Sequence, residues 1–104
     1  MNGAMMIADE RQRQIKEEGW TSKHDASLTG FCLTTAGAAY ALDAASVHSD
    51  YHQSHKTRYA KHAMENWPFD EEGFKPTPND PVRQLVKAGA LIAAEIDRLI
   101  AKGV

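Results

Sequence analysis

The chain of 104 residues is poor in several features that mark specialised classes of protein. Its single cysteine, Cys32, excludes an internal disulfide and fits a reducing compartment. Twelve basic and fourteen acidic side chains give a net charge of −2, so no general positive field draws the protein to nucleic acid. No apolar run approaches membrane-spanning length, and the run Met5-Met6-Ile7 is followed at once by charges, unlike a signal peptide. We therefore expect a soluble cytoplasmic protein that binds neither membranes nor nucleic acid.

Large aliphatic side chains are also scarce. The chain has 16 alanines but only 15 isoleucines, leucines and valines together, and eight of those 15 lie between Pro81 and Ala101. A chain of this length has room for one core, and most of it has little with which to build that core alone. We expect one helical domain over residues 1–104, with residues 1–7 flexible, that gains buried area as a homo-oligomer.

The strongest structural signal lies in residues 80–104. Asp80 is a good N-cap, Pro81 suits the first helical position, and Gly103 provides a stop. Apolar residues at three- and four-residue spacing predict an amphipathic helix. Its predicted buried face consists of Val82, Leu85, Val86, Gly89, Ile92, Ala93, Ile96, Leu99 and Ile100. Leu91 lies off this stripe, so the apolar face suits the middle of a bundle or a subunit interface.

A second long helix is predicted for residues 28–47, and a short charged helix for residues 9–18. The apolar spacing of residues 28–47 predicts a buried face of Leu28, Phe31, Cys32, Thr35, Ala39, Leu42 and Ala45 or Ser46. Both this helix and the run Ala88-Gly89-Ala90 are rich in small residues, so we expect the two to pack closely. The predicted fold is an all-α, small helical bundle: two long alanine-rich antiparallel helices, a short N-terminal helix and a proline- and aromatic-rich loop.

That loop covers residues 66–79, where three prolines and Gly73 prevent a regular helix. Trp67, Phe69 and Phe74 are too apolar to remain in water, and we expect them to fold back and close one end of the core. The alternative is that they wall a pocket with Lys75 at its mouth.

Residues 48–62 are rich in histidine. If they are helical, one face carries His48, His52, His55, Tyr59 and His62. Imidazoles four residues apart can share a metal, and together with the nearby lysines and arginine they can receive phosphate. A solvated face is the alternative, since no cysteine or nearby acid completes a metal motif. The sequence leaves the role of this segment open.

Short blocks along nearly the whole chain carry a resemblance to a known family. They include Glu10-Arg11-Gln12-Arg13-Gln14-Ile15, Glu18-Gly19-Trp20-Thr21, His24-Asp25, Trp67-Pro68 and Leu85-Val86-Lys87-Ala88-Gly89-Ala90-Leu91-Ile92. In these blocks the chain resembles a family of small tailed-phage and prophage proteins. That family is distantly similar to the all-α nucleoside triphosphate pyrophosphohydrolases of the MazG kind, which hold magnesium between acidic residues on two antiparallel helices. The resemblance implies a helical protein of the bacterial host cytoplasm.

The chain departs from the hydrolase pattern where the metal would bind. The hydrolases have His-Asp-Asp-x-His followed by Glu-Leu-Ala. At the positions that look equivalent, this chain has His24-Asp25-Ala26-Ser27-Leu28 and Cys32-Leu33-Thr34. Ala26, Leu28 and Cys32 thus replace an aspartate, a histidine and a glutamate. Magnesium requires oxygen ligands, so the departure argues against metal-dependent hydrolysis.

These observations lead to a binding protein that sequesters a small phosphate-bearing, nucleotide-derived signal of antiphage defence, without catalysis and without a cofactor. Basic side chains can receive phosphate, aromatic rings can stack on a base, and we expect subunit interfaces to supply the concavity. The candidate ligand-binding residues are Arg11, Arg13, Trp20, Thr21, His24, Tyr40, Trp67, Lys75, Arg83 and Lys87.

Two alternatives stay open. One is a magnesium-dependent nucleotide pyrophosphohydrolase, with Glu17, Glu18, Asp25, Asp43, Glu95 and Asp97 as possible ligands. The other is a phage accessory protein that binds a host protein through the wide apolar face or through residues 48–62.

Overall fold

The computed structural model describes residues 1–21, 32–48 and 53–104. These ranges form four α-helices and one short 3-10 helix: α1 (Gly3–Glu17), α3 (Cys32–His48), α4 (Gln53–Asn66), η1 (Glu71–Gly73) and α5 (Pro81–Ala101). They contain no strand, and the predicted all-α fold is confirmed. None of the described helices combines the length and the apolar content that crossing a membrane requires.

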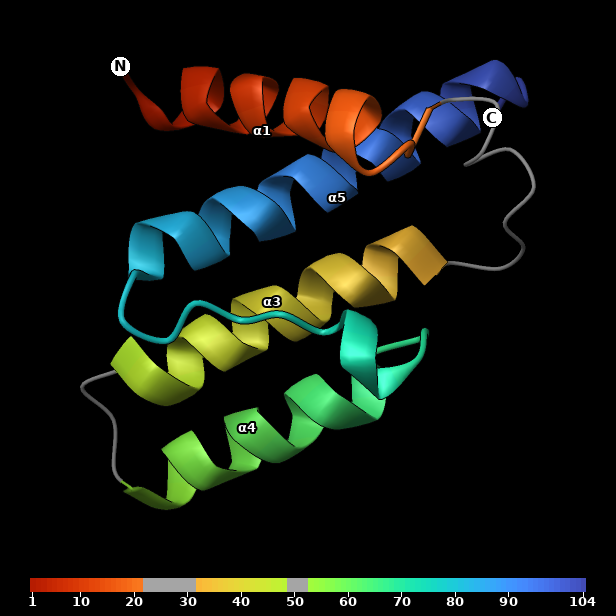
Figure 1. The fold of residues 1–104 in the computed structure, drawn as a ribbon. Helices are drawn as coiled ribbons and strands as arrows, with labels where there is room; N and C mark the ends of the chain where they lie inside the picture. Colours follow the sequence, from red (N-terminus) through yellow and green to blue (C-terminus); the bar gives the residue numbers. More distant parts are fainter. Residues whose placement is uncertain (22–31, 49–52) are drawn as a thin grey trace.

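The helices lie side by side in the order α1, α5, α3, α4 (Figure 1). Helix α5 contacts α1 on one side and α3 on the other, and α3 also contacts α4; no other pair of described helices touches. Helix α3 runs antiparallel to α5 and α4, whereas α1 runs parallel to α5 (Figure 1). In a closed four-helix bundle the two outer helices would also meet. The described helices therefore form a single open row.

The ends of α5 form as its sequence predicts. The Asp80 Oδ1 atom accepts a hydrogen bond from the Arg83 backbone N–H at 3.0 Å, and Pro81 occupies the first turn. Beyond Ala101 the chain turns through Gly103, whose φ of 81° lies in the left-handed region that favours glycine. Local capping chemistry is sufficient to define both ends of this helix.

The apolar face that periodicity predicts for α5 is not the face buried within a single chain. Its buried residues are Gln84, Val86, Ala88, Ala90, Leu91, Ala94, Glu95 and Arg98, so only Val86 of the predicted face is buried. Val82, Leu85, Ile92, Ile96 and Ile100 are instead 45–66% exposed. The physical reason is that α3 packs on the alanine-rich side of α5, where two backbones can come close, and Leu91 is the only large aliphatic residue of α5 in the core cluster of the described residues.

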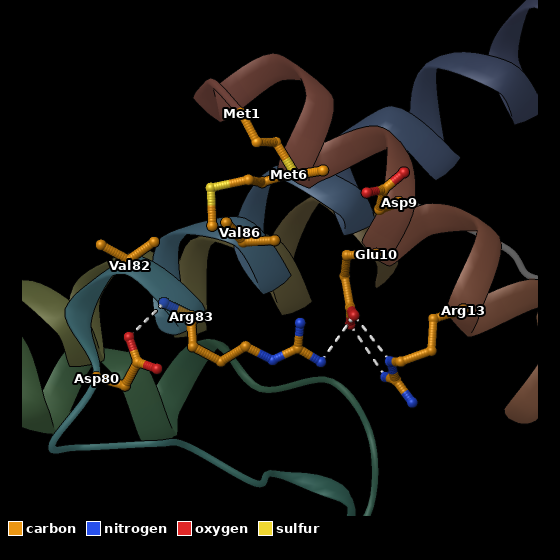
Figure 2. A pocket seen from close by; sticks show the side chains of 9 residues that line it. All are labelled: Met1, Met6, Asp9, Glu10, Arg13, Asp80, Val82, Arg83 and Val86. Carbon is orange, nitrogen blue, oxygen red and sulfur yellow. Dashed lines mark hydrogen bonds and ion pairs between the residues drawn. The ribbon is translucent and has the colours of Figure 1, made fainter.

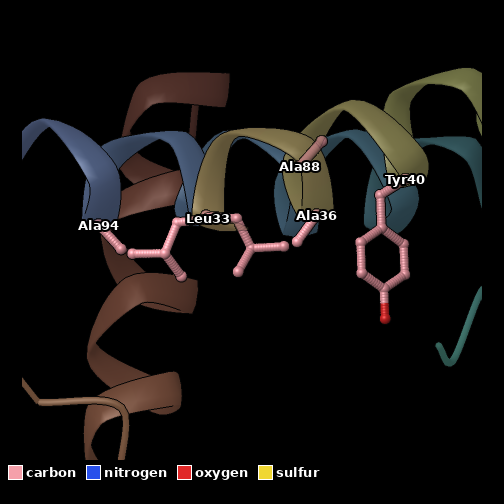
Figure 3. Close-up of a cluster of buried hydrophobic side chains, with 6 residues drawn as sticks. Leu33, Ala36, Tyr40, Ala88 and Ala94 are labelled. Carbon is pink, nitrogen blue, oxygen red and sulfur yellow. The ribbon is translucent and has the colours of Figure 1, made fainter. Parts of the chain in front are cut away.

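The predicted close pairing of the two alanine-rich helices is confirmed. The core cluster joins Leu33, Ala36 and Tyr40 of α3 to Ala88, Leu91 and Ala94 of α5; Figure 3 labels five of them. At Gly37 the approach is closest, because an added Cβ would lie 3.1 Å from the carbonyl oxygen of Ala88. It would also lie 3.0 Å from Cγ1 of Ile92. Glycine at this position is therefore part of the helix contact.

The predicted stripe of α3 is only partly correct. Ala39 is buried as expected, but the other buried residues of this helix are Leu33, Ala36, Gly37, Tyr40 and Ala44. Cys32, Thr35, Leu42, Ala45 and Ser46 are half-buried instead. Helix α3 lies between α5 and α4, so it packs on two sides and a single stripe does not describe it. Leu28 and Phe31 lie outside the described residues.

Helix α1 begins earlier than predicted. The sequence suggests a helix from Asp9 with residues 1–7 flexible, whereas the helix starts at Gly3 because Asn2 Oδ1 accepts the Met5 N–H at 3.0 Å. Ile7 packs over Gly89, where an added Cβ would lie only 2.5 Å from Ile7 Cδ1. The space over Gly89 is therefore occupied by α1 and not by α3.

The loop after α4 folds back onto the core through Trp67 and Phe74, as predicted, whereas Phe69 does not reach the core cluster. Trp67 and Phe74 pack against the core cluster with ring centroids 5.1 Å apart, and both contact Tyr40. Phe69 is 41% exposed and contacts the edge of Trp67. The loop crosses over α3 on its way to α5 (Figure 1), so it covers one side of the row.

Replacing Gly37 with leucine tests the close approach. The Gly37→Leu variant is expected to lower the free energy of unfolding by about 1–3 kcal/mol, because the Ala88 backbone cannot move without separating α3 from α5. Urea unfolding followed by circular dichroism measures the change. Gly3→Leu is the matched control, since a Cβ at Gly3 meets nothing within 4 Å. Equal losses in the two variants would contradict the contact.

Candidate functional site

Five of the ten predicted ligand residues line one hollow of about 170 Å³. These five come from α1, the turn after it, α3, the loop and α5: Arg13, Trp20, Tyr40, Lys75 and Lys87. Glu10, Gln14, Glu18, Gly73 and Leu91 complete the lining. The fold therefore brings together aromatic and basic groups that are far apart in sequence.

Tyr40 contacts two other residues that line the hollow, Lys75 and Lys87. Its hydroxyl oxygen accepts a hydrogen bond from the Lys75 backbone N–H at 3.0 Å. The Lys87 Nζ atom lies 5.6 Å from the centre of the Tyr40 ring, within the range of a cation–π contact. Burial raises the pKa of the Tyr40 phenol above 10.0, so the ring stays neutral at physiological pH. Tyr40 is thus a fixed support for the loop and for Lys87.

Lys87 is a partly buried basic group of the hollow. Burial lowers the pKa of its ammonium group, and the nearby charge of Arg83 lowers it further. One N–H of Nζ donates to the Lys75 carbonyl oxygen at 2.8 Å. An ammonium group has three N–H donors, and within the described chain the other two have no hydrogen-bond acceptor. Lys87 can therefore donate to a bound anion.

Glu10, which the sequence does not single out as a site residue, lies at the centre of an ion-pair network. Its buried carboxylate accepts hydrogen bonds from Arg13 Nε at 2.7 Å and Nη2 at 3.0 Å, and lies 2.7 Å from Arg83 Nη2 (Figure 2). Burial alone raises the pKa of this carboxyl. The hydrogen bonds from Arg13 and the charge of Arg83 more than offset burial, so the pKa lies below 4.5.

In this network the positive charges of Arg13 and Arg83 are already paired with carboxylates. Arg13 also donates to Glu17 and Glu18, each at 3.2 Å, and its hydrogen bonds to Glu10 and these acids raise its pKa. Three carboxylates thus face the two guanidinium groups of Arg13 and Arg83. An anion gains little from a cation that is already paired. Lys75 and Lys87 remain as the basic groups most available to phosphate.

A second hollow of about 300 Å³ shares Glu10 and Arg13 with the first (Figure 2). Met1, Met6, Val82 and Val86 form its apolar part; Asp9, Glu10, Arg13, Asp80 and Arg83 form its charged part. Three acidic and two basic residues make this lining unfavourable for an anion. Arg83, a predicted ligand residue, therefore lies in the less suitable of the two hollows.

Three more predicted ligand residues line neither hollow. Arg11 is buried, with Nη1 donating to the Trp20 carbonyl at 2.8 Å and Nε 4.0 Å from Asp97. Trp67 packs with Tyr40 and Phe74, and its Nε1 donates to the Asp70 carbonyl at 2.8 Å. Thr21 is exposed. Of the ten candidates, His24 alone lies outside the described residues.

The acids proposed as magnesium ligands are dispersed, apart from the neighbours Glu17 and Glu18 beside Arg13. Glu95 accepts hydrogen bonds from Thr34 at 2.9 Å and from Arg98. Burial raises the pKa of Glu95, but these two partners bring it below 4.5. Asp43 accepts from Gln84 at 2.6 Å, and Asp97 lies near Arg11. No three histidine, cysteine, aspartate or glutamate side chains in the described ranges are placed to hold a metal ion. Asp25 lies outside those ranges.

The histidine-rich segment is only partly described. Helix α4 begins at Gln53, and residues 49–52 fall outside the description. His62 is exposed, with Nδ1 3.1 Å from a carboxylate oxygen of Glu65. Whether residues 48–62 bind an anion or a metal remains a prediction.

The buried polar residues Glu10 and Gln14 share one face of α1 with Ile7, at intervals of three and four residues. This spacing is a usable sequence signal once polar residues are allowed on an inward face. The pattern of α1 alone does not establish that Glu10 is buried, because the charge of the buried carboxylate is compensated by Arg83 of the partner helix α5.

No family model matches the chain, and no curated protein or solved structure is significantly similar to it. The function is therefore argued from the geometry of the site.

Replacing Glu10 with glutamine tests the network. Because the folded-state pKa of Glu10 is depressed, its contribution to stability is present above about pH 4.5 and is lost as the pH falls through the folded-state value. Glu10→Gln is expected to lower the free energy of unfolding by about 2 kcal/mol at pH 7 and to make its fall toward acid pH shallower. Urea unfolding at several pH values measures both effects. The exposed Glu72→Gln serves as the control and should leave the profile unchanged.

Proposed function

We propose that the protein is a phage-type, homo-oligomeric binding module that sequesters a small phosphate-bearing, nucleotide-derived ligand without transforming it. The observation that supports this most is the hollow in which Trp20 and Tyr40 lie beside Lys75 and Lys87. Aromatic rings stack on bases, and ammonium groups bind phosphate oxygens. The hollow thus contains groups suited to the base and groups suited to the phosphate of a nucleotide.

The groups of the hollow have different tasks in this proposal. Tyr40 is buried and holds the loop, whereas Trp20 is only partly buried and is the ring on which a base can stack. Lys75 is exposed, and Lys87 has N–H donors without acceptors; these two receive the phosphate. Arg13 is held by three glutamates, so its role is to position those acids and close the wall of the hollow.

The size of the hollow limits how the ligand is held. Its volume of about 170 Å³ is below the roughly 300–1,000 Å³ of common small-molecule sites. It can enclose a ring or a phosphate group but not a whole nucleotide, so part of the ligand must lie along the protein surface.

Capture without hydrolysis is favoured by the state of the acids. Glu17, Glu18, Asp43, Glu95 and Asp97 each face a guanidinium, hydroxyl or amide group of the chain itself. A carboxylate already paired in this way is a poorer ligand for a hard cation. Sequestration of a defence signal on behalf of the phage is the role that the family resemblance suggests.

A ligand-release experiment tests the proposal directly. The purified chain is incubated with magnesium and a panel of linear, cyclic and dinucleotide compounds, and the unbound compounds are removed. The protein is then denatured by heat, and the released material is weighed by mass spectrometry. Intact ligand supports capture, whereas a hydrolysed product would establish the pyrophosphohydrolase alternative. No retained compound at all would leave the chain as an accessory protein and refute the proposal.

Replacing Lys87 tests which groups bind. Lys87→Met removes a charge-assisted hydrogen bond worth about 1.5–3 kcal/mol, so the dissociation constant of the retained ligand is expected to rise roughly 10- to 100-fold. Isothermal titration calorimetry measures the change, and circular dichroism checks that helix content is kept. Lys61→Met, an exposed site on α4 that lines neither hollow, is the control. An equal effect at Lys61 would mean that overall charge, not the hollow, determines binding.

A further inference from the structure

The exposed face of α5 is the largest feature that the ligand hollow does not explain. We call the α5 stripe the exposed residues Val82, Leu85, Ile92, Ile96 and Ile100, with the half-buried Gly89 and Leu99 between them. Positions 82, 85, 89, 92, 96 and 99 alternate by three and four residues. This is the seven-residue repeat by which one helix packs along another.

The stripe is separate from the ligand hollow. At about 100° per residue, its centre lies roughly half a turn around α5 from Lys87 and Leu91, which line the hollow. A partner that covers the stripe therefore leaves the hollow accessible.

The arrangement of helices also calls for a second layer. Folded domains generally pack two layers around one core, because each amphipathic helix must bury its apolar face. The described helices form one row, and α5 is in its interior with the five large aliphatic residues of the stripe 45–66% exposed. A continuous apolar patch of this kind marks a protein interface.

We propose that a second copy of this chain covers the stripe, related by a twofold axis, with the two α5 helices antiparallel. The repeat is symmetric about the point between Ala90 and Leu91. Leu85 then faces the second copy's Ile96, Val82 faces its Leu99, and Gly89 faces its Ile92. Ile7 of α1 fills the space over Gly89, so the second copy's Ile92 packs against Ile7 at this level.

The charges of α5 do not oppose this pairing. Arg83 is bound to Glu10, Glu95 to Arg98, and Asp97 lies near Arg11, so these groups face α1, α3 or their own helix. The stripe itself contains no charged residue. An antiparallel pair also places each helix N-terminus near the C-terminus of its partner, where the dipoles attract.

The available area suits a stable dimer. A helix of 21 residues is about 30 Å long, and α1 and α3 beside it widen the face to about 25 Å. The resulting area of roughly 750 Å² is close to the ~800 Å² per partner of standard interfaces. Self-complementarity of the repeat favours a second copy over an unrelated host protein, for which such symmetry has no use.

The proposed dimer specifies the homo-oligomer of the proposed function. Because it is tested without any ligand, a negative result for the dimer can be told apart from a negative result for ligand binding. Light scattering after gel filtration should give twice the chain mass of 11.5 kDa for the parent. Leu85→Glu and Ile96→Glu should each give single chains with unchanged helix content, since both sites are exposed in one chain. Met64→Glu on α4, 45% exposed, is the matched control and should stay dimeric. A monomeric parent, or glutamate variants that remain dimeric, would overturn the inference.

A crosslinking experiment determines the direction of the pair and does not depend on the glutamate variants folding. In a Cys32→Ser background, Leu85→Cys chains are mixed with Ile96→Cys chains and oxidised. The antiparallel pair predicts disulfides between the two kinds of chain, with few within either kind. Disulfides that join only like chains would show a parallel pair, and no disulfide at all would show that the stripe is not the interface. Either result refutes the proposal.

Discussion

The close contact between α3 and α5 is the constraint on which the rest of the molecule depends. The two helices meet through Ala36, Gly37, Ala88 and Ala94, so the backbones are near, and most of the bulky aliphatic side chains of α5 are exposed on another side. Two polar links between the same helices hold them in register: Thr34 to Glu95 near one end, and Asp43 to Gln84 near the other. The ligand hollow and the α5 stripe are the two consequences of this contact.

The contact of α1 with α5 has a different physical basis. Ile7 fills the space over Gly89, but the neighbouring buried groups are Glu10, Arg11 and Gln14. A buried carboxylate between two guanidinium groups satisfies its hydrogen bonds, yet desolvation of the charges cancels much of the gain. Such an interface adds specificity more than stability.

Part of the candidate site could be predicted from sequence. Arg13, Trp20, Tyr40, Lys75 and Lys87 do line one hollow, because residue chemistry identifies groups capable of binding a base or a phosphate. Arg13 lies three residues after Glu10 and four before Glu17, so ion pairs within α1 could be predicted from sequence. The sequence could not tell that Arg83 of α5 pairs with Glu10, or that Arg11 donates to the Trp20 carbonyl, because these contacts depend on how the chain folds back on itself.

The sequence by itself determined the helical class, both ends of α5 and the return of the aromatic loop onto the core. Caps, proline geometry and the burial of Trp67 and Phe74 depend on local chemistry and general hydrophobicity, which a single chain segment carries. Only the tertiary structure decided which face of α5 is buried. Hydrophobic periodicity identifies the most apolar face of a helix, but the buried face of α5 depends on how closely the α3 and α5 backbones can approach. The small residues Ala88, Gly37 and Ala94 permit that close approach, whereas Leu85 and Ile96 would prevent it.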